Sequence, residues 1–398
     1  MKAYPLPYGL TNLDMTIPSE QDVVLLHPPC LRQATGPDPD QESVIRRALA
    51  HPVESEPLRS MAKPGQKMVI IISDGSRLCP TPLLLPAILE ELHAAGVTDN
   101  RIRILVALGL HRRHTEGELE RLVGPSVYRR IRVLNHSAQP EDCIHLGTTS
   151  RGTPVEINRH LVEADLVIAT GNNRLAGLSG GLKAVVPGCA FRRTIEANHG
   201  LMLSAKAEPG SSANPVREDL EEAASCLPVH FLVNVVVDPE RRLLAAAAGH
   251  PVYAHRKLAD ITRNLFFTPL DQPADLVIAS CGGHPKDIHL YQAIKTLQNA
   301  AEAAKPGAPL LLVARCGEQF GSGTFQEWVE TYPDRQRAVA SLHARFRIGA
   351  HKLLAVDSVL AEHQVSLCSD MPPSLVGLIG FEPIEPSGLQ SALNRLIQ

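Results

Sequence analysis

The sequence predicts an α/β protein built from two domains, and three observations lead to this fold class. Short runs of β-branched and aliphatic residues alternate with helical stretches, which is the pattern of parallel strands joined by crossover helices. The same alternation starts again in the C-terminal third of the chain. In addition, a chain of 398 residues exceeds the length at which one hydrophobic core keeps growing, so a second core is expected.

The first domain is expected to contain four buried strands, with a helix after the first of them. The strands are predicted at 67–73, 101–108, 164–170 and 231–237, and the Ala/Leu/Glu-rich stretch 83–95 predicts the helix. Thr115 followed by Glu118 is the pattern of a capping box, which predicts the start of a further helix.

The second domain is expected to repeat this order of elements. A strand is predicted at 275–280, a helix at 290–304 and another strand at 309–314. The boundary is expected between residues 254 and 273, and we divide the chain into an N-terminal domain, 1–262, and a C-terminal domain, 263–398.

The composition is that of a globular enzyme and argues against several other classes of protein. Apolar residues make up 44% of the chain and charged residues 20%. A net charge of −3 without any basic block argues against a nucleic-acid partner. Residues 1–16 lack the features of a signal peptide and no apolar run approaches a membrane span, so a cytoplasmic protein without a membrane partner is expected. The 8 cysteines form no CxxC pair, which favours reduced thiols.

A glycine-rich loop that ends in Lys183 is the strongest functional feature of the sequence. The segment 171–183 follows a predicted buried strand, and glycine is used where the backbone approaches a ligand closely. The loop is not a P-loop, because the residues beside Lys183 are neither glycine nor serine or threonine. It also lacks the G-x-G-x-x-G spacing of a dinucleotide-binding turn. Lys183 is therefore either delivered to an unusual ligand or a solvated lysine after a flexible loop.

Polar residues follow four of the predicted strands at the point where each strand ends. Asp74 and Arg77 follow the first strand, His111 follows the second, the loop of Lys183 follows the third, and His284 follows the strand at 275–280. Each has an ordinary explanation alone, such as a turn cap, a surface charge or a structural histidine. Because ligands of α/β proteins bind at the carboxyl ends of strands, their joint occurrence indicates one composite site between the domains.

Together these motifs resemble the nickel-pincer lactate racemase family of 2-hydroxyacid racemases and epimerases. The resemblance runs from Tyr8-Gly9 to the region of His351-Lys352. The motifs that carry it are Asp74-x-x-Arg77, Ala107-Leu108-Gly109-x-His111-Arg112, Ala176-Gly177-x-Ser179-Gly180-Gly181-x-Lys183, His199 and Tyr291-Gln292-x-x-Lys295. The resemblance implies an isomerase with two Rossmann-like α/β domains and the active site in the cleft between them.

The resemblance also implies a cofactor and the residues that hold it. The cofactor is nickel bound by pyridinium-3,5-bisthiocarboxylic acid mononucleotide, the nickel-pincer nucleotide, which would be attached through Lys183. His199 would supply a nickel ligand, and imidazole suits nickel. Further residues implied to contact the cofactor are Ser179, Gly180, Gly181, Asp74 and Arg77. Proteins that synthesise the cofactor are implied partners.

The reaction implied by the resemblance inverts C2 of a small-molecule 2-hydroxy acid. A base takes the hydroxyl proton while a hydride passes to the cofactor, and the resulting 2-keto acid takes the hydride back on its other face. His111 occupies a catalytic acid/base position, which suits a side chain whose ordinary pKa is near neutrality. Asp74 is implied to orient His111, and Arg77 to hold an anionic group.

The resemblance assigns substrate binding to a second set of residues. Gln292 and Lys295 are three residues apart on a predicted helix, so they should share one face and, with Tyr291, receive the substrate carboxylate. The alternative for this pair is an exposed helix surface.

One position departs from the family pattern. Ten residues before the lysine the family has a second acid/base histidine, whereas this chain has Asn173, followed by Arg174. An amide does not accept a proton at neutral pH. Either His114, His284 or Arg174 serves the second face of the substrate, or His111 serves both faces, or the reaction is not a symmetric racemisation.

The same departure bears on the substrate. Asn173 and Arg174 add hydrogen-bond donors, which predicts a substrate more polar than lactate, such as a dicarboxylic or sugar acid. Lactate or another short-chain 2-hydroxy acid is the alternative. Two rival classes are an oxidoreductase or lyase with an exchanging nicotinamide cofactor, and a non-catalytic binder or carrier of the nickel cofactor. The nicotinamide enzyme would require a G-x-G-x-x-G fingerprint, which the sequence lacks. A non-catalytic carrier would not require His111.

Overall fold

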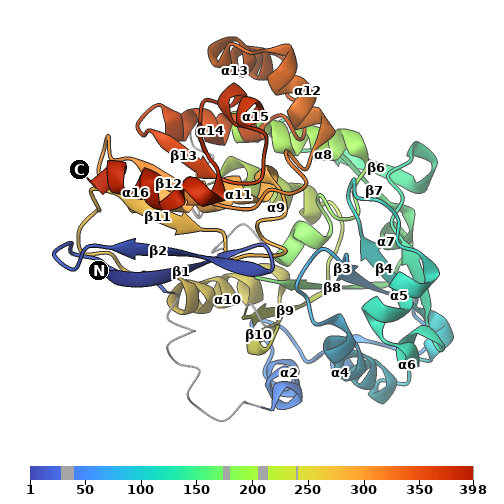
Figure 1. The fold of residues 1–398 in the computed structure, drawn as a ribbon. Helices are drawn as coiled ribbons and strands as arrows, with labels where there is room; N and C mark the ends of the chain where they lie inside the picture. The colour runs from blue at the N-terminus through green and yellow to red at the C-terminus, as the bar shows by residue number, and fades with distance from the viewer. Residues whose placement is uncertain (28–39, 174–179, 205–213, 239–240, 398) are drawn as a thin grey trace. The chain divides into compact units, whose positions relative to one another are not determined.

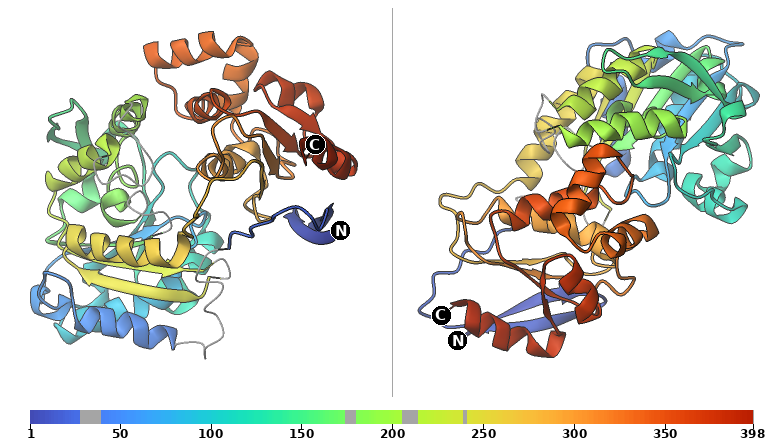
Figure 2. Two further views of the ribbon diagram at one scale, coloured as in Figure 1. Left: turned by 90° about the vertical axis from the view of Figure 1, so that its left-hand side faces the viewer. Right: turned by 90° about the horizontal axis from the view of Figure 1, so that it is seen from above.

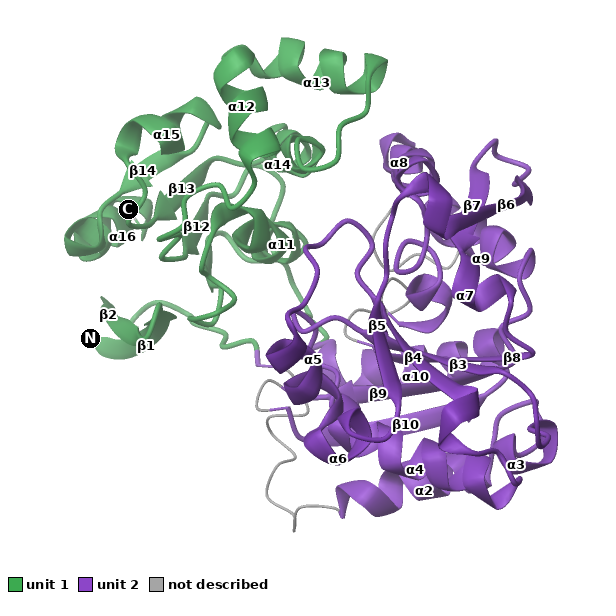
Figure 3. Cartoon of the chain, turned by 90° about the vertical axis from the view of Figure 1, so that its right-hand side faces the viewer, with its two compact units in different colours: residues 1–26, 269–398 green, residues 27–268 purple. Residues whose placement is uncertain are grey.

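The computed structural model of the protein describes residues 1–27, 40–173, 180–204, 214–238 and 241–397. The chain folds into two compact units, coloured separately in Figure 3. Unit 2 is one continuous segment, His27–Thr268, and unit 1 combines Met1–Leu26 with Pro269–Gln398.

The expected division into 1–262 and 263–398 differs from these units in two ways. Residue 262 lies inside helix α10 (Pro251–Phe266), so the change of unit comes after that helix has ended. The N-terminal residues also belong with the C-terminal part of the chain. They form the hairpin β1 (Lys2–Tyr8) and β2 (Thr11–Ile17), whose buried side chains share a core with strands of unit 1.

Unit 2 is built on a six-stranded sheet in the order β10-β9-β8-β3-β4-β5. Only β10 is antiparallel to its neighbour. The strands are β3 (Met68–Ser73), β4 (Ile102–Ala107), β5 (Arg132–Asn135), β8 (Leu166–Asn172), β9 (Phe231–Val237) and β10 (Leu243–Gly249). The four strands predicted for this part of the chain are confirmed. Every residue of β8 and β9 is buried, as expected for central parallel strands.

Helices and a small hairpin surround this sheet (Figure 1). Alternate residues of β3, such as Ile70 and Ile72, pack in one core with Ile45 of α2 and Leu85 of α4, while α10 contacts β9 and β10. The helices are α2 (Gln41–Ala50), α3 (Leu58–Met61), α4 (Thr81–Ala94), α5 (Glu116–Val123), α6 (Pro125–Tyr128), α7 (Arg159–Val162), α8 (Arg192–Gly200), α9 (Pro215–Ser225) and α10, and the hairpin is β6 (Cys143–Thr148) with β7 (Pro154–Asn158). Short 3-10 turns lie at η1 (Asp99–Arg101), η2 (Pro140–Asp142), η3 (Gly181–Ala184) and η4 (Leu201–Leu203).

Unit 1 contains a smaller parallel sheet in the order β11-β12-β13-β14. Its strands are β11 (Val277–Ser280), β12 (Leu310–Val313), β13 (Val365–Cys368) and β14 (Glu382–Ile384). Its helices are α11 (Leu290–Ala301), α12 (Gly323–Thr331), α13 (Arg335–Ala344), α14 (Lys352–Leu360), α15 (Pro373–Leu378) and α16 (Leu389–Ile397), with the 3-10 turn η5 (Pro386–Gly388). The strand, helix and strand predicted for the second domain are confirmed as β11, α11 and β12. The chain is therefore an α/β protein with two units, one built on a mainly parallel sheet and the other on a parallel sheet.

The N-terminal hairpin lies beside α16 in both views of Figure 2. The backbone N–H of Thr16 donates to Oε1 of Gln390 at 2.8 Å, and the hydroxyl of Tyr8 donates to the carboxylate of Asp370 after β13. Tyr4, Tyr8 and Met15 share the apolar core of Leu311 in β12. Burial of these side chains explains why the first 26 residues belong to unit 1.

Among the helices described by the structure, none has both the length and the apolar character needed to cross a membrane.

Candidate functional site

Three neighbouring strands of unit 2 end at one edge of the sheet, and each is followed by residues singled out in the sequence. Strand β3 leads to Asp74, β4 leads to His111, and β8 leads to the loop of Lys183. Because β3 pairs in parallel with both β4 and β8, these three segments leave the sheet side by side. The segments after β3 and β4 meet through the side chains of Asp74 and His111. The segments after β4 and β8 meet through the backbones of Gly109 and Gly188.

Asp74 is a buried carboxylate with three polar neighbours. Its Oδ2 lies 3.2 Å from Nδ1 of His111 and 3.7 Å from Nε of Arg77, and its Oδ1 accepts a hydrogen bond of 2.7 Å from the backbone N–H of Ser76. Burial by itself would raise the pKa of Asp74, but the hydrogen bonds from His111 and Ser76 and the charge of Arg77 outweigh it and lower the pKa to about 2. The side chain is therefore ionised at neutral pH.

The contact with Asp74 determines which nitrogen of the His111 ring carries the proton. An ionised carboxylate only accepts hydrogen bonds, so Nδ1 of His111 carries the proton and Nε2 is the basic nitrogen. The His111 side chain is 51% exposed, and Asp74 only 6%, so the imidazole is accessible while its partner is not. This arrangement can hold a general base in one tautomer.

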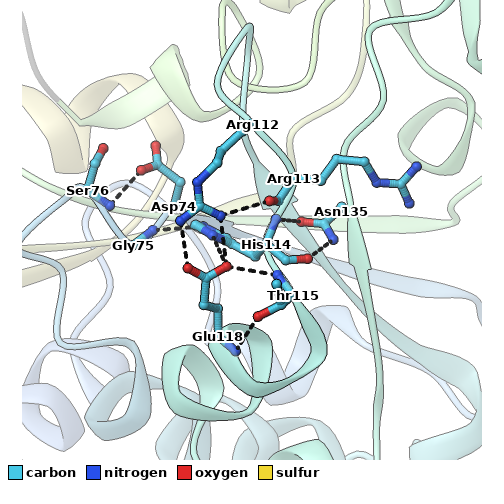
Figure 4. Close-up of polar contacts among 9 residues, drawn as sticks. All are labelled: Asp74, Gly75, Ser76, Arg112, Arg113, His114, Thr115, Glu118 and Asn135. Atoms are coloured by element: carbon cyan, nitrogen blue, oxygen red, sulfur yellow. Dashed lines mark hydrogen bonds and ion pairs between the residues drawn. The ribbon is translucent and has the colours of Figure 1, made fainter. Parts of the chain in front are cut away.

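His114, a candidate for the second base, has a structural role in the protein instead (Figure 4). Its Nε2 accepts the backbone N–H of Gly75 at 3.1 Å, and its Nδ1 lies 3.6 Å from Oε2 of Glu118. Its backbone is held by two hydrogen bonds to the side chain of Asn135. The lone pair of Nε2 is thus taken by Gly75, while Nδ1 is buried without a hydrogen-bond partner among the described residues.

The start of α5 confirms the predicted capping box. The hydroxyl of Thr115 accepts the backbone N–H of Glu118, and the Glu118 carboxylate accepts the backbone N–H of Thr115. Arg112 donates to both oxygens of the same carboxylate, at 2.9 and 2.7 Å, and lowers the pKa of Glu118 (Figure 4). The segment that carries His111 is therefore anchored at its far end.

The described part of the lysine loop needs glycine at two successive positions. Gly180 and Gly181 have φ values of 76° and 61°. A Cβ atom at Gly180 would lie 2.0 Å from Oδ1 of Asn173, and one at Gly181 would lie 2.8 Å from Cδ2 of His255. The chain then enters the 3-10 turn η3, which contains Lys183 with a half-buried side chain.

The backbone joins this turn to the segment of His111. The N–H of Gly188 donates to the carbonyl of Lys183 at 3.2 Å, and the carbonyl of Gly188 accepts the N–H of Gly109 at 2.8 Å. A Cβ atom at Gly188 would lie 2.7 Å from Cβ of Ala107 at the end of β4. Glycine therefore allows the turn of Lys183 to pack directly on the strand that leads to His111.

His199 lies on α8 with one ring nitrogen unused by the protein. Its Nδ1 is buried and has no hydrogen-bond partner among the described residues. Burial, together with the nearby charge of Lys183, lowers the pKa of His199 to about 4. The imidazole is neutral at neutral pH, which is the form that binds a metal ion.

Asn173 was expected to offer its amide to a substrate, but its side chain is completely buried. Its Oδ1 accepts a hydrogen bond of 2.9 Å from Nδ2 of Asn234, and its Nδ2 lies 3.5 Å from the carbonyl oxygen of His255. The amide therefore ties β8 to β9 and α10. Arg174 and Ser179, two other predicted site residues, lie outside the described residues.

Unit 1 carries the predicted substrate-binding residues at the start of α11. Gln292 and Lys295 do share one face of this helix, because Nζ of Lys295 donates to Oε1 of Gln292 at 2.6 Å. The ring of Tyr291 packs edge-on against His351, and Nζ of Lys352 lies 5.2 Å from its centre. His284, the other candidate base, is exposed after β11.

Several residues around the lysine loop were missed by sequence reasoning. Asn234 is a buried polar residue inside the apolar strand β9, and this interruption was a signal that could have been noticed. Arg217 and His255 contact the glycines of the loop from α9 and α10. No motif marks them, because each is far from the loop in sequence.

Comparison with known proteins agrees with the α/β fold of the chain. The family description "Lactate racemase N-terminal domain" matches residues 8–210, and "Lactate racemase C-terminal domain" matches residues 270–377. The lactate racemase of Thermoanaerobacterium thermosaccharolyticum is 31% identical over 352 residues, which cover 86% of this chain and 81% of that protein. The lactate racemase of Lactiplantibacillus plantarum is 32% identical over 292 residues, covering 72% and 68%.

Two solved structures are similar to all or most of the chain. The lactate racemase apoprotein of T. thermosaccharolyticum superposes with a TM-score of 0.89 at 28% identity and covers 100% of this chain and 96% of its own. A protein from Thermotoga maritima superposes with a TM-score of 0.66 at 20% identity, covering 89% and 94%, and shares the fold.

Proposed function

Because this chain belongs to the lactate racemase family and is thus a 2-hydroxyacid racemase, an isomerase, we propose that it inverts C2 of its substrate by reversible hydride transfer to a nickel-pincer nucleotide. The observation that carries this proposal is that the segments of Asp74, His111 and Lys183 come together at one edge of the unit 2 sheet. There the His111–Asp74 pair and the turn of Lys183 leave adjacent strands and are joined through Gly109 and Gly188.

The residues of this chain fit the proposed cofactor. Gly180 and Gly181 let the backbone pack closely on Asn173 and His255, and this fixed turn leads directly to Lys183, the proposed attachment point. His199 offers a neutral imidazole with a nitrogen unused by the protein. The described residues contain no group of three or more His, Cys, Asp or Glu side chains arranged for a metal, so we propose His199 as the chain's own nickel ligand.

When bound, the cofactor supplies a reversible acceptor for the hydride that leaves C2 of the substrate. The protein's part is to move one proton. We propose that Nε2 of His111 takes the proton of the substrate hydroxyl as the hydride leaves, which yields a 2-keto acid. Asp74 stabilises the resulting imidazolium through Nδ1.

We further propose that His111 serves both faces of the substrate. Asn173 offers no base, and the Nε2 lone pair of the mostly buried His114 ring already accepts the backbone N–H of Gly75. After the 2-keto acid has rotated so that its other face is presented, His111 returns the same proton to the oxygen while the hydride returns to that opposite face of C2. His111 is then the base in the first half of the reaction and the acid in the second half, whichever stereoisomer is the substrate.

Charged side chains would hold the anionic substrate and cofactor. Arg77 lies 3.7 Å from Asp74 and is 58% exposed, so it can orient toward an anion while it also supports the ionised Asp74. In unit 1, Lys295 and Gln292 present an ammonium and an amide together, and Tyr291 precedes them on the helix. We propose that these three residues bind the substrate carboxylate.

The test is inversion at C2 of a 2-hydroxy acid by protein isolated from a host that makes the nucleotide. Starting from one enantiomer of lactate, malate or gluconate, chiral chromatography should detect the C2 inversion product. Intact-protein mass spectrometry should show an added mass, peptide mapping should place it on the peptide of Lys183, and metal analysis should find about one nickel per chain. A matched Lys183→Ala protein should lack both. An adduct that persists in Lys183→Ala would overturn the attachment, and an adduct without any inversion would indicate a carrier.

The polarity of the substrate is a finer proposal. Asn173 does not support it, since its amide is buried, so a dicarboxylic or sugar acid substrate rests on Arg174 in place of the family motif. We propose that malate or gluconate has a higher kcat/KM than lactate, and that Arg174→Ala removes the difference. Lactate as the best substrate in both proteins would contradict this proposal.

A further inference from the structure

Helix α9 lies against both parts of the proposed cofactor site in unit 2. It contacts the turn η3, which contains Lys183, and the helix α8, which carries His199. The start of α9 is well defined, because the side chain of Asn214 accepts the backbone N–H of Val216 and Pro215 occupies the first turn. Two buried charged residues in this first part of α9 make the contacts.

Arg217 reaches the glycines before Lys183. Its side chain is 7% exposed, and its three nitrogens each have a different partner: Nη1 lies 3.4 Å from the carbonyl oxygen of Gly180, Nη2 lies 3.2 Å from Nδ1 of His255, and Nε donates to Glu221 at 2.7 Å. A Cβ atom at Gly181 would lie 2.9 Å from Nη2. The guanidinium thus packs directly on the backbone turn that leads to Lys183.

Asp219 reaches the residue beside His199. It is completely buried, and Nδ2 of Asn198 donates to its Oδ2 at 2.8 Å and to the carbonyl of Val216 at 3.0 Å. The hydroxyls of Thr149 and Thr153, from the turn between β6 and β7, donate to the same carboxylate at 2.6 and 2.8 Å. Both N–H groups of Asn198 are therefore bound to α9.

We infer that α9 sets the position of Lys183 relative to His199, with Arg217 and Asp219 as two positioning residues for the cofactor. Residues two apart on a helix point to different sides, so one short segment can hold two neighbours at once. Arg217 determines where the Gly180–Gly181 turn directs Lys183. Asp219, through Asn198, determines where α8 places His199. A nucleotide attached at one side chain and bound through nickel at the other needs this spacing to be fixed.

Burying both charges is costly unless each forms several hydrogen bonds, and each does. Glu218, between them, is 44% exposed and pairs with Arg151 on the surface. The same helix turn therefore contains two charged side chains directed at the site and one directed at solvent. That contrast supplies a matched control.

The inference rests on the proposed function and is tested by measuring two quantities separately on protein from a host that makes the nucleotide. The first is the fraction of chains with the mass adduct at Lys183, and the second is the number of nickel ions per adduct. The variants are Arg217→Met, Arg217→Lys, Asn198→Ala and Glu218→Gln, compared with wild type. The thermal midpoint of each protein without cofactor identifies any variant that fails to fold.

Each side of the helix should change a different quantity. Arg217→Met should lower the adduct fraction at least about tenfold, because a small displacement of an attacking group has a large effect on reaction rate. Arg217→Lys keeps the positive charge but lacks the planar guanidinium group with its several N–H donors, so it should recover part of that loss. Asn198→Ala should leave the adduct fraction near that of wild type but weaken nickel binding about 10- to 100-fold, as is usual when support of a ligand is lost. Glu218→Gln should match wild type in both.

A general structural role would lower both quantities together, in proportion to folded protein, and would overturn the inference. Folded Arg217 and Asn198 variants that load like wild type would also overturn it, while the proposed function would stand. A wild-type protein without adduct would overturn the proposed function and this inference with it.

Discussion

Nδ1 of the accessible His111 ring lies 3.2 Å from Oδ2 of the buried carboxylate of Asp74. The two residues follow adjacent parallel strands, β3 and β4, whose register pairs Ser73 with Ala107. The pairing of two strands therefore places a base next to the group that sets its tautomer.

Replacing His111 by alanine should remove the proposed proton acceptor but leave the proposed attachment of the cofactor at Lys183 intact. General acid/base groups contribute roughly 10²- to 10⁴-fold, so kcat should fall by about that factor while nickel per chain stays constant. The measurement is chiral chromatography of the product together with metal analysis. His145→Ala, at an exposed histidine of β6, is the control. Turnover close to wild type in His111→Ala would refute the assigned role.

Replacing Asp74 by asparagine should hold His111 in the wrong tautomer. The backbone N–H of Ser76 requires an acceptor at Oδ1, so the amide oxygen takes that place and the NH₂ group faces Nδ1 of His111. The proton then moves to Nε2, and kcat should fall by about 10²-fold or more. Asp99→Asn is a matched control, because Asp99 pairs with His93 at 2.8 Å away from the site. Equal rates for the two variants would contradict this mechanism.

The stability of the protein should fall between pH 7 and pH 5 because of His136. Burial lowers its pKa to about 4, and both ring nitrogens are bound, Nε2 to the carbonyl of Ala190 and Nδ1 to the amide of Asn158. The folded pKa is below the unfolded value near 6.5, so as the pH falls from 6.5 toward 4 the unfolded chain takes up the proton first and is favoured.

That uptake should cost about 2 kcal/mol of unfolding free energy at pH 5 relative to pH 7. Urea denaturation at the two pH values measures it. His136→Gln retains hydrogen-bonding groups but does not titrate, so its stability should depend less on pH by that amount. An unchanged difference between pH 7 and pH 5 in His136→Gln would rule out this origin.

Gly180→Ala should destabilise unit 2 and block loading of the cofactor. The φ of 76° is unfavourable for alanine by about 1–2 kcal/mol, and the added methyl group would meet Oδ1 of Asn173. We expect a loss of at least about 2 kcal/mol in denaturant unfolding, with little adduct on Lys183. Gly117→Ala in α5 is the control, since nothing lies within 4 Å of its Cβ and alanine favours helix. A Gly180→Ala protein as stable as wild type would show that the turn tolerates a side chain.

Removing Lys295 or Gln292 of α11, which we propose to bind the substrate carboxylate, should affect substrate binding more than turnover. A charged hydrogen bond contributes roughly 1.5–3 kcal/mol, so Lys295→Met should raise KM about 10- to 100-fold, and Gln292→Leu by a smaller factor. Steady-state kinetics on one enantiomer measures both. Lys305→Met, at an exposed lysine paired with Asp275, is the control. A lower kcat with constant KM would instead place Lys295 in the chemical step.

The strands that were predicted have local signals, whereas β5, β10, β13 and β14 of the same two sheets were not predicted. The strand predicted at 231–237 coincides with β9, and the other apolar runs lie within a few residues of β3, β4, β8, β11 and β12. The capping box at Thr115 is likewise a pattern of four neighbouring residues. The position of the N-terminal hairpin was not predictable in this way, since it depends on apolar contacts with strands that follow almost 300 residues later.

The sequence by itself determined the α/β class, the strand ends that carry Asp74, His111 and the lysine loop, and the glycines that loop requires, because each follows from local periodicity or backbone sterics. Only the tertiary structure decided that Asn173 is bound by Asn234 and that Arg217 packs on Gly180. These contacts join residues 37 to 61 positions apart. The partner of a buried polar group depends on which strands and helices become neighbours, and that choice is made by packing of the whole unit.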